Sequence, residues 1–457
     1  MNWGKINKNV NYSTVGRLFI KNNYEHLLFI LLLFFLFYKL SEYKDKFISM
    51  VPDQWTVIIG LSDSVYQNHI GNTLIIIRLI ASIIDGFASP FYIWYIFNLL
   101  VWALVLIALY TNILIAFSSR MASIVVIALF TSSPRLYGQF ALPYSQTCWS
   151  LPLLIVLIYA IFVQKRRCKV FGFFHVLVSI SCYLVFSSSI IFVNLFILSL
   201  FIYLDGFSNF ARKVSLKAMA VFLAINSLIL LIQEKISSTY PSVDPGANIM
   251  FFGGNYFENV DINSELILSF IRAYVNTQIF WLHAVFFIAL FIFPLYLTIF
   301  IFGMNLSKKI DFFTLFLLFN FYLMSIFIVR YNGVGILNYD RYFMYIFILL
   351  LIPFGVILKN SFLAQKVTAL VFIIVVIFRL MSFDSNLDYQ LGNSQLSNRE
   401  TKTLYIADDS DRSWAIKIVQ VCLEGDRSKF EELAVLGHSN KLNFSTTCQR
   451  VNHWFEG

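Results

Sequence analysis

Long apolar runs follow one another along most of the 457 residues, and short polar stretches separate them. Such runs can cross the roughly 30 Å of hydrocarbon in a bilayer. They lack the alternation of membrane β-strands, so they predict helices that satisfy their own backbone hydrogen bonds. The pattern therefore predicts an all-α polytopic membrane protein with about eleven transmembrane helices. The predicted spans are 24–40, 91–110, 121–133, 149–163, 170–186, 190–204, 216–232, 281–304, 312–329, 342–358 and 367–380.

Basic residues lie mainly in the short stretches between these runs, which excludes a concentrated nucleic-acid surface despite the net charge of +9. We place the N-terminus in the cytoplasm and expect its first helix to be retained, since no cleavage site follows it. The cytoplasmic loops then hold Lys165, Arg166, Arg167, Lys169, Arg212, Lys213, Lys308, Lys309, Lys359 and Lys366. This is the positive-inside pattern. It requires the short segment 72–84, which carries Arg78, to be an interfacial or half-buried helix rather than a span.

Three sizeable regions then fall on the extracytoplasmic side: 41–90, 233–280 and the chain after residue 382. All predicted cytoplasmic loops are short, so the working face is expected to be the outer one. The chain accordingly divides into a transmembrane domain, 1–383, and an extracytoplasmic C-terminal domain, 384–457.

The C-terminal segment mixes polar and charged residues and predicts a small α/β domain. We expect a strand at 403–407, an N-cap cluster at 408–411, a helix at 412–423 closed by Gly425, and a second strand at 434–437. Cys422 and Cys448 are candidates for a disulfide in an oxidising compartment. Their spacing alone leaves the pairing open.

The first outer region carries three acids near the membrane surface, Asp53, Asp63 and Asp85. A carboxylate in this place is able to take the proton from an attacking sugar hydroxyl. The alternative is that these are ordinary loop charges solvated by headgroups and water. Arg78 lies in the apolar run TLIIIRLIASII. A charge there faces protein, water or a phosphate rather than lipid, so phosphate binding and structural pairing both stay open.

Further arginines are predicted to face outward, against positive-inside statistics. They are Arg330 and Arg341, which bracket a short loop, together with Arg135 and Arg272. Guanidinium groups form forked hydrogen bonds with phosphate, so this placement favours binding of an anionic lipid phosphate. No Walker loop, dinucleotide fingerprint or zinc-protease spacing is present in the sequence. The sequence therefore identifies no cofactor site and no metal ligands, and a divalent-metal requirement stays open.

An ordered set of residues runs through the first outer region: Asp63 and Tyr66, then Gly71, Arg78, Asp85 and Pro90. Later segments are SISCYLVFSSSIIF, NYDRY and DSDRSWAIKIVQ, the last followed by ELAVLGHSN. With these motifs the chain resembles the bacterial serotype-converting glucosyltransferases, membrane-embedded glycosyltransferases of the GT-C type, over nearly its whole length. Ser62 stands where a second acid is expected, and Leu184 where a glutamine is common. The choice of catalytic acid between Asp63 and Asp53 therefore stays open.

The resemblance implies a multi-pass protein of the bacterial inner membrane with a periplasmic C-terminal domain. It implies transfer of a hexose, with glucose the expected sugar, from an undecaprenyl-phosphate donor to an O-antigen repeat. Such lipopolysaccharide modification converts serotype, and a small flippase and a donor synthase are the expected partners. Asp63 would deprotonate the acceptor, and Arg78 and Arg341 would bind the donor phosphate.

Two other functions are compatible with an outward-facing membrane protein. An O-antigen polymerase is expected to have a large arginine-rich outer loop in mid-chain, whereas the stretch 234–265 holds few cations. A lipid-linked-sugar flippase or transporter is expected to carry charges within several helices and inverted repeats, and neither is evident.

Overall fold

The computed structural model describes residues 26–34, 36–38, 57–59, 75–117, 143–165, 167, 173–185, 414–436 and 442–456, with isolated positions at 120–131 and 220–231. Its labelled helices, in chain order, are α4 (Ile75–Ile84), α5 (Pro90–Phe117), α8 (Pro143–Gln164), α9 (Phe173–Val185), α21 (Trp414–Glu424), α22 (Arg427–Leu436) and α23 (Phe444–Glu456). The described residues are mostly helical and contain no strand, in agreement with an all-α fold. The number of spans rests largely on residues outside this set.

Helix α5 is the long central element. It begins at Pro90 and continues to Phe117, about two turns beyond the end of the predicted span 91–110. Pro90 suits its first position, where the missing N–H has no partner to lose. Among the described helices, α5 alone has both the length and the apolar composition to cross a membrane, two criteria that a buried core helix also meets. The described parts of the neighbouring apolar helices, including α9, are shorter.

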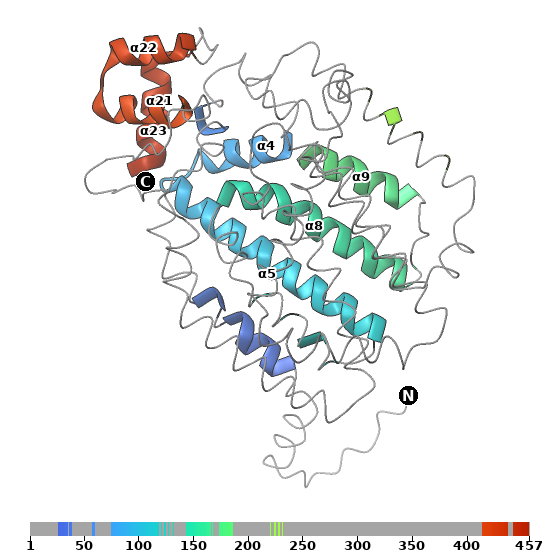
Figure 1. Ribbon diagram of the computed structural model, residues 1–457. Helices are drawn as coiled ribbons and strands as arrows, with labels where there is room; N and C mark the ends of the chain where they lie inside the picture. Colours follow the sequence, from blue (N-terminus) through green and yellow to red (C-terminus); the bar gives the residue numbers. More distant parts are fainter. Residues whose placement is uncertain are drawn as a thin grey trace, which may run out of the picture.

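Helices α5 and α8 pack side by side and run in the same direction (Figure 1). Their later halves are joined by Asn112, whose Nδ2 donates to the Leu157 carbonyl at 2.9 Å, while Gln164 donates to Asn112 Oδ1 at 2.6 Å. Asn112 is buried, so these bonds satisfy a polar side chain inside an apolar interface.

Helix α9 runs antiparallel to α8. Tyr159 near the end of α8 lies beside His175 near the start of α9, with Oη to Nδ1 3.4 Å. Earlier in α8, the Pro152 carbonyl accepts from the Cys182 thiol, which lies late in α9. The turn between these helices therefore lies at the same end of the bundle as the end of α5. The antiparallel order of α8 and α9 is the one expected for the consecutive predicted spans 149–163 and 170–186.

The N-terminal helix, described over 26–34 and 36–38, starts beside the later half of α5. The Tyr110 hydroxyl lies 2.9 Å from His26 Nδ1, and the Phe29 ring stacks on Tyr110 with centroids 4.3 Å apart. The start of this helix and the end of α5 thus lie at the same end of the bundle.

Helix α4 lies across the other end of the bundle and touches α5, α8 and α9 (Figure 1). Its ten residues span about 15 Å, half of what a crossing needs. Ile77, Ala81 and Ile84 are buried against the bundle, and Leu79 and Ile83 are exposed. Residues 72–74 of the predicted segment lie outside the described residues, so its interfacial placement stays a prediction.

The C-terminal unit, defined here as α21, α22 and α23, forms a three-helix cluster (Figure 1). The predicted helix 412–423 corresponds to α21, and Gly425 ends it with a φ of 74°, which glycine adopts without steric cost. The predicted strand at 434–437 is wrong, because residues 434–436 form the last turn of α22. Phe430 and Ala434, four residues apart, are buried on one side of that helix, so packing favours the helical period. The predicted strand 403–407 and cap cluster 408–411 lie outside the described residues.

Asp426 caps the start of α22 and gives its stability a pH dependence. The Lys429 N–H and the Ser428 side chain donate to its carboxylate, and these bonds lower the pKa of Asp426 below its ordinary 3.8. A carboxyl group with a lowered folded-state pKa stabilises the fold above its unfolded pKa and loses that contribution as the pH falls through the folded value. We expect amide-exchange protection of residues 427–436, corrected for intrinsic rates, to fall as the pH drops below about 4. Asp426→Asn keeps a capping oxygen and should show little change; an equal fall in that variant would contradict the prediction.

Candidate functional site

The corner between α4 and α5 is the place where distant parts of the described chain meet. Asp85 follows α4 directly, and its N–H donates to the Ala81 carbonyl at 2.8 Å, so it continues the helical ladder. The Gly86 and Phe87 N–H groups then bond to carbonyls three residues earlier, which ends the helix. These backbone hydrogen bonds fix the position of Asp85 at the corner.

Three side chains of α23 converge on Asp85. Arg450 Nε donates to Oδ2 at 3.1 Å, and Trp454 Nε1 donates to Oδ1 at 2.6 Å. His453 Nε2 lies 3.0 Å from the Asp85 carbonyl oxygen, which is an acceptor only, so this nitrogen donates. Both carboxylate oxygens are engaged. The contact joins residues more than 360 positions apart in the chain.

The indole of Trp454 adds an apolar contact to the polar one. Trp454 is fully buried and meets two rings of the first turns of α5 edge-on, Phe91 at 5.3 Å and Trp94 at 5.6 Å between centroids. Edge-to-face pairs at these distances are favourable. The C-terminal unit therefore packs on α5 and also forms hydrogen bonds to the corner before it.

Two faces of helix α23 make different contacts. Arg450, His453 and Trp454 share one face by the i, i+3, i+4 spacing and contact the corner. Cys448 and Val451 are buried and belong to the other, within a helix that also contacts α21 and α22. The corner contact is not predicted by the sequence. The i, i+3, i+4 spacing of Arg450, His453 and Trp454 could have indicated a polar contact face on this helix. Nothing in the neighbouring sequence identifies Asp85 as their partner.

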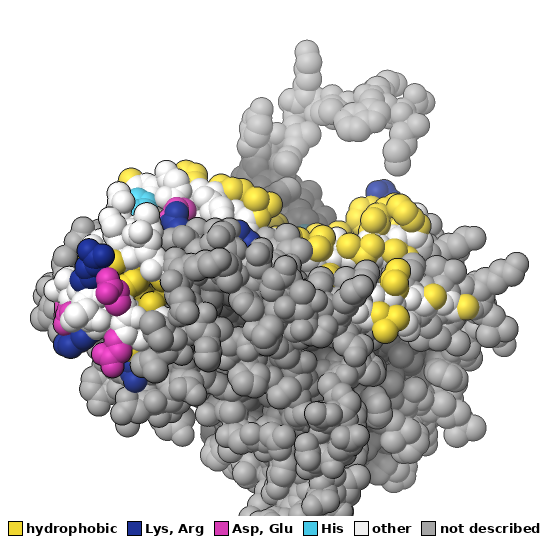
Figure 2. Space-filling view, turned by 90° about the horizontal axis from the view of Figure 1, so that it is seen from above, with side chains coloured by type: hydrophobic (Ala, Val, Ile, Leu, Met, Phe, Trp, Pro, Cys, Tyr) yellow, Lys and Arg dark blue, Asp and Glu magenta, His cyan; other side chains and the backbone are white. Residues whose placement is uncertain are grey.

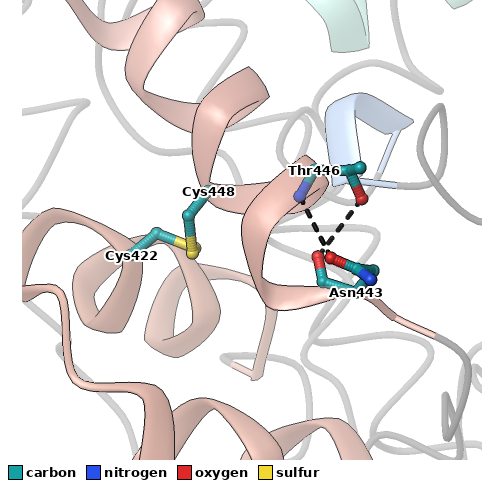
Figure 3. The surroundings of a disulfide bond; sticks show 4 residues. All are labelled: Cys422, Asn443, Thr446 and Cys448. Atoms are coloured by element: carbon teal, nitrogen blue, oxygen red, sulfur yellow. Dashed lines mark hydrogen bonds between the residues drawn. A yellow bond between two sulfur atoms is a disulfide. The ribbon is translucent and has the colours of Figure 1, made fainter.

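The pairing that the sequence left open is a disulfide: Cys422 of α21 is bonded to Cys448 of α23, with Cα atoms 4.8 Å apart (Figure 3). Figure 3 also shows Asn443 at the start of α23, where its Oδ1 accepts from the Thr446 N–H at 3.3 Å. This is an N-cap bond, which satisfies one of the free donors of the first turn. The bridge and the cap fix the helix that carries the three Asp85 contacts.

Removing the disulfide should loosen the C-terminal unit. The bridged residues are 26 positions apart in sequence. The chain-entropy relation for a loop of that size gives about 3.5 kcal/mol of stability. We expect the double variant Cys422→Ser with Cys448→Ser to lose amide-exchange protection throughout α21–α23. Cys182→Ser, which alters a buried free thiol in α9, is the control and should leave that protection unchanged; equal protection in wild type and the double variant would contradict the prediction.

Arg78 lies on α4, the helix that Asp85 follows directly, and is partly exposed. Partial burial lowers the pKa of Arg78 from its ordinary value. An arginine remains protonated at neutral pH even so. Its position seven residues before Asp85 places the two on the same flank of α4, about 20° apart around the axis.

Of the residues predicted to bind phosphate or to transfer a proton, the structure describes Arg78 and Asp85. The C-terminal unit contacts Asp85. The other candidates lie outside the described residues: Asp53, Asp63, Tyr66, Arg135, Arg272, Arg330 and Arg341. Within the part of the chain that is described, no group of three His, Cys, Asp or Glu side chains is placed to hold a metal ion.

One end of the bundle carries basic side chains, and the other carries α4 and the C-terminal unit. The turn after α8 exposes Lys165 and Arg167, and Arg120 follows the end of α5. The opposite end carries α4 and the C-terminal unit with its disulfide. Seen from above in Figure 2, charged side chains of both signs gather over one side of the described surface, and hydrophobic side chains cover much of the remainder.

No protein-family model, curated protein or solved structure matches the chain.

Proposed function

We propose that the chain is a membrane-embedded glycosyltransferase. It moves a hexose from a polyprenyl-phosphate donor to the O-antigen repeat on the outer side of the membrane. The observation that carries the proposal is the position of α4: the helix bearing Arg78 lies at the end of the bundle where the disulfide-bonded C-terminal unit docks.

The surface of α5 supports a location in the membrane. One side of this helix is buried, as Trp94 and Trp102 show. A second apolar stripe, with 42 to 57% exposure, runs along the helix through Tyr92, Ile96, Leu100, Leu104 and Ile107. The stripe is about 22 Å long. A helix that is apolar on its packed side and on its exposed side suits lipid contact, whereas water would make such a contiguous surface costly.

The contrast between the two ends supports the orientation. Disulfides persist in oxidising compartments, which for a bacterial inner-membrane protein is the outer side. Short loops rich in Lys and Arg stay in the cytoplasm. The disulfide of the C-terminal unit and the exposed pair Lys165 and Arg167 lie at opposite ends of the described bundle. Both criteria therefore point to the same orientation, with α4 on the outer side.

The proposed chemistry divides between an acid and arginines. Asp63 deprotonates the acceptor hydroxyl, which attacks the sugar as the bond to the donor phosphate breaks. Arg78 and Arg341 bind that phosphate, and their forked N–H groups stabilise the charge that it carries as the leaving group. A short helix across the end of the bundle suits a phosphate at headgroup depth. Asp85 is bound by α23, so we assign it no part in the proton transfer.

The test is to express the chain in a bacterial strain of defined O-antigen that supplies polyprenyl-phosphate hexose on the outer side. The polysaccharide is then compared by mass spectrometry and NMR with that of the strain carrying the empty vector. An added side-branch hexose is the expected result. A changed distribution of chain lengths would instead indicate a polymerase. An unaltered polysaccharide, with the protein present in the membrane, would contradict the proposal.

A further inference from the structure

The corner contact links the C-terminal unit to one particular flank of α4. Asp85 keeps the helical register of α4 through its N–H bond to Ala81. Arg78 lies two turns earlier on the same flank. Any rotation or tilt of α4 that freed Asp85 from Arg450 and Trp454 would therefore move Arg78 as well.

Helix α4 depends on such outside contacts for its position. Isolated helices of ten residues are marginal in water, and most helical stability in proteins comes from packing. The buried side of α4 offers the small residue Ala81 and two isoleucines, Ile77 and Ile84. The hydrophobic effect that buries these side chains is non-directional, whereas hydrogen bonds fix an orientation. The bonds at Asp85 supply that direction.

The C-terminal unit is suited to hold the corner. Helix α23 contributes two donors to the carboxylate, one donor to the backbone carbonyl, and an indole in edge-on contact with the rings of Phe91 and Trp94. The disulfide ties the helix that provides all four contacts to α21. Helix α23 therefore contacts both Asp85, directly after α4, and the start of α5.

We propose that Asp85 is a positioning residue: Arg450 and Trp454 hold it, and the C-terminal unit thereby sets where Arg78 meets the donor phosphate. The identity of that phosphate rests on the proposed function. The holding of α4 does not, because it follows from the contacts at the corner.

The first measurement needs no activity. Amide exchange of residues 75–84 is followed in the full-length protein in lipid nanodiscs, for wild type, Asp85→Ala and Asp85→Asn. We expect about tenfold faster exchange of α4 in Asp85→Ala, while non-reducing electrophoresis shows the disulfide intact. Asp85→Asn keeps the side-chain shape and an acceptor for Trp454, so its effect should be smaller. Arg427→Ala, which removes an exposed ion pair with Glu431 inside the C-terminal unit, is the matched control and should leave α4 unchanged.

The second measurement is a double-mutant cycle on hexose transfer. Asp85→Ala should raise the KM for the polyprenyl-phosphate donor about tenfold, because a displaced binding group loses its contribution. In an Arg78→Gln background the same change should raise KM less than about twofold, since the two residues act through one interaction.

Each outcome decides a different point. Unchanged exchange of α4 in Asp85→Ala would overturn the holding role. Faster exchange with additive effects on KM would overturn the link to Arg78. Absence of hexose transfer by the wild-type protein would contradict the proposed function, and the exchange result would still decide whether the C-terminal unit holds α4.

Discussion

Hexose transfer is expected to be lost when Asp63 is replaced by asparagine. Asparagine has nearly the same shape as aspartate but is unable to accept the proton of the acceptor hydroxyl. General-base catalysis typically contributes about 10² to 10⁴ in rate, so transfer should fall by at least about a hundredfold. The measurement is the initial rate of hexose transfer in membranes that contain equal amounts of each protein.

Asp53 is the matched control, because it is the other acid of the first outer region considered for this role. Asp53→Asn should keep most of the activity. If Asp63→Asn were active and Asp53→Asn inactive, the proton acceptor would be Asp53. Retained activity in both variants would exclude a general base at either position.

The second large effect is expected for Trp454→Ala, measured as stability of the docked C-terminal unit. Trp454 is fully buried, packs on Phe91 and Trp94, and donates to Asp85. Truncation of a buried aromatic side chain to alanine typically costs about 3 to 5 kcal/mol, since it removes apolar contacts and leaves a cavity. Amide exchange of α23 in the full-length protein would measure this loss as a lower free energy of opening.

A conservative variant separates the two parts of that contact. Trp454→Phe keeps an aromatic ring against α5 but removes the N–H donor to Asp85. A hydrogen bond to a charged group is worth about 1.5 to 3 kcal/mol, so this variant should lose less than Trp454→Ala. Equal losses in the two variants would indicate that the ring contributes nothing. Wild-type stability in Trp454→Ala would show that α23 is held elsewhere.

Local signals were enough to locate much of the described helical structure. The apolar run after Pro90 predicted α5, and the segment that ends at Gly425 predicted α21. The predicted end of α5 was too early because Thr111 and Asn112 interrupt the apolar run. In the structure Thr111 donates to the Ile107 carbonyl of its own helix, and Asn112 donates to Leu157 in α8. The second of these partners is invisible in the local sequence.

The strand predicted at 434–437 failed for a related reason. A short run such as Ala-Val-Leu is compatible with a strand or with a helix, and periodicity over so few residues does not decide between them. The cap at Asp426 and the burial of Phe430 and Ala434 favour the helix. Asp85 shows the same limit at the site. Its carboxylate suggested chemistry or solvation, whereas its partners lie on α23, at the other end of the chain.

The sequence by itself determined that α5, α8, α9 and α21 are helical, and it determined the basic and acidic composition of the segments between apolar runs. These properties depend on composition and on local periodicity, which neighbouring residues carry. The tertiary structure decided which cysteines are joined, which direction α8 and α9 take beside α5, and what binds Asp85. These features depend on contacts between residues far apart in the chain. The periodicity of neighbouring residues does not identify such partners, because side-chain geometry in the folded protein selects them.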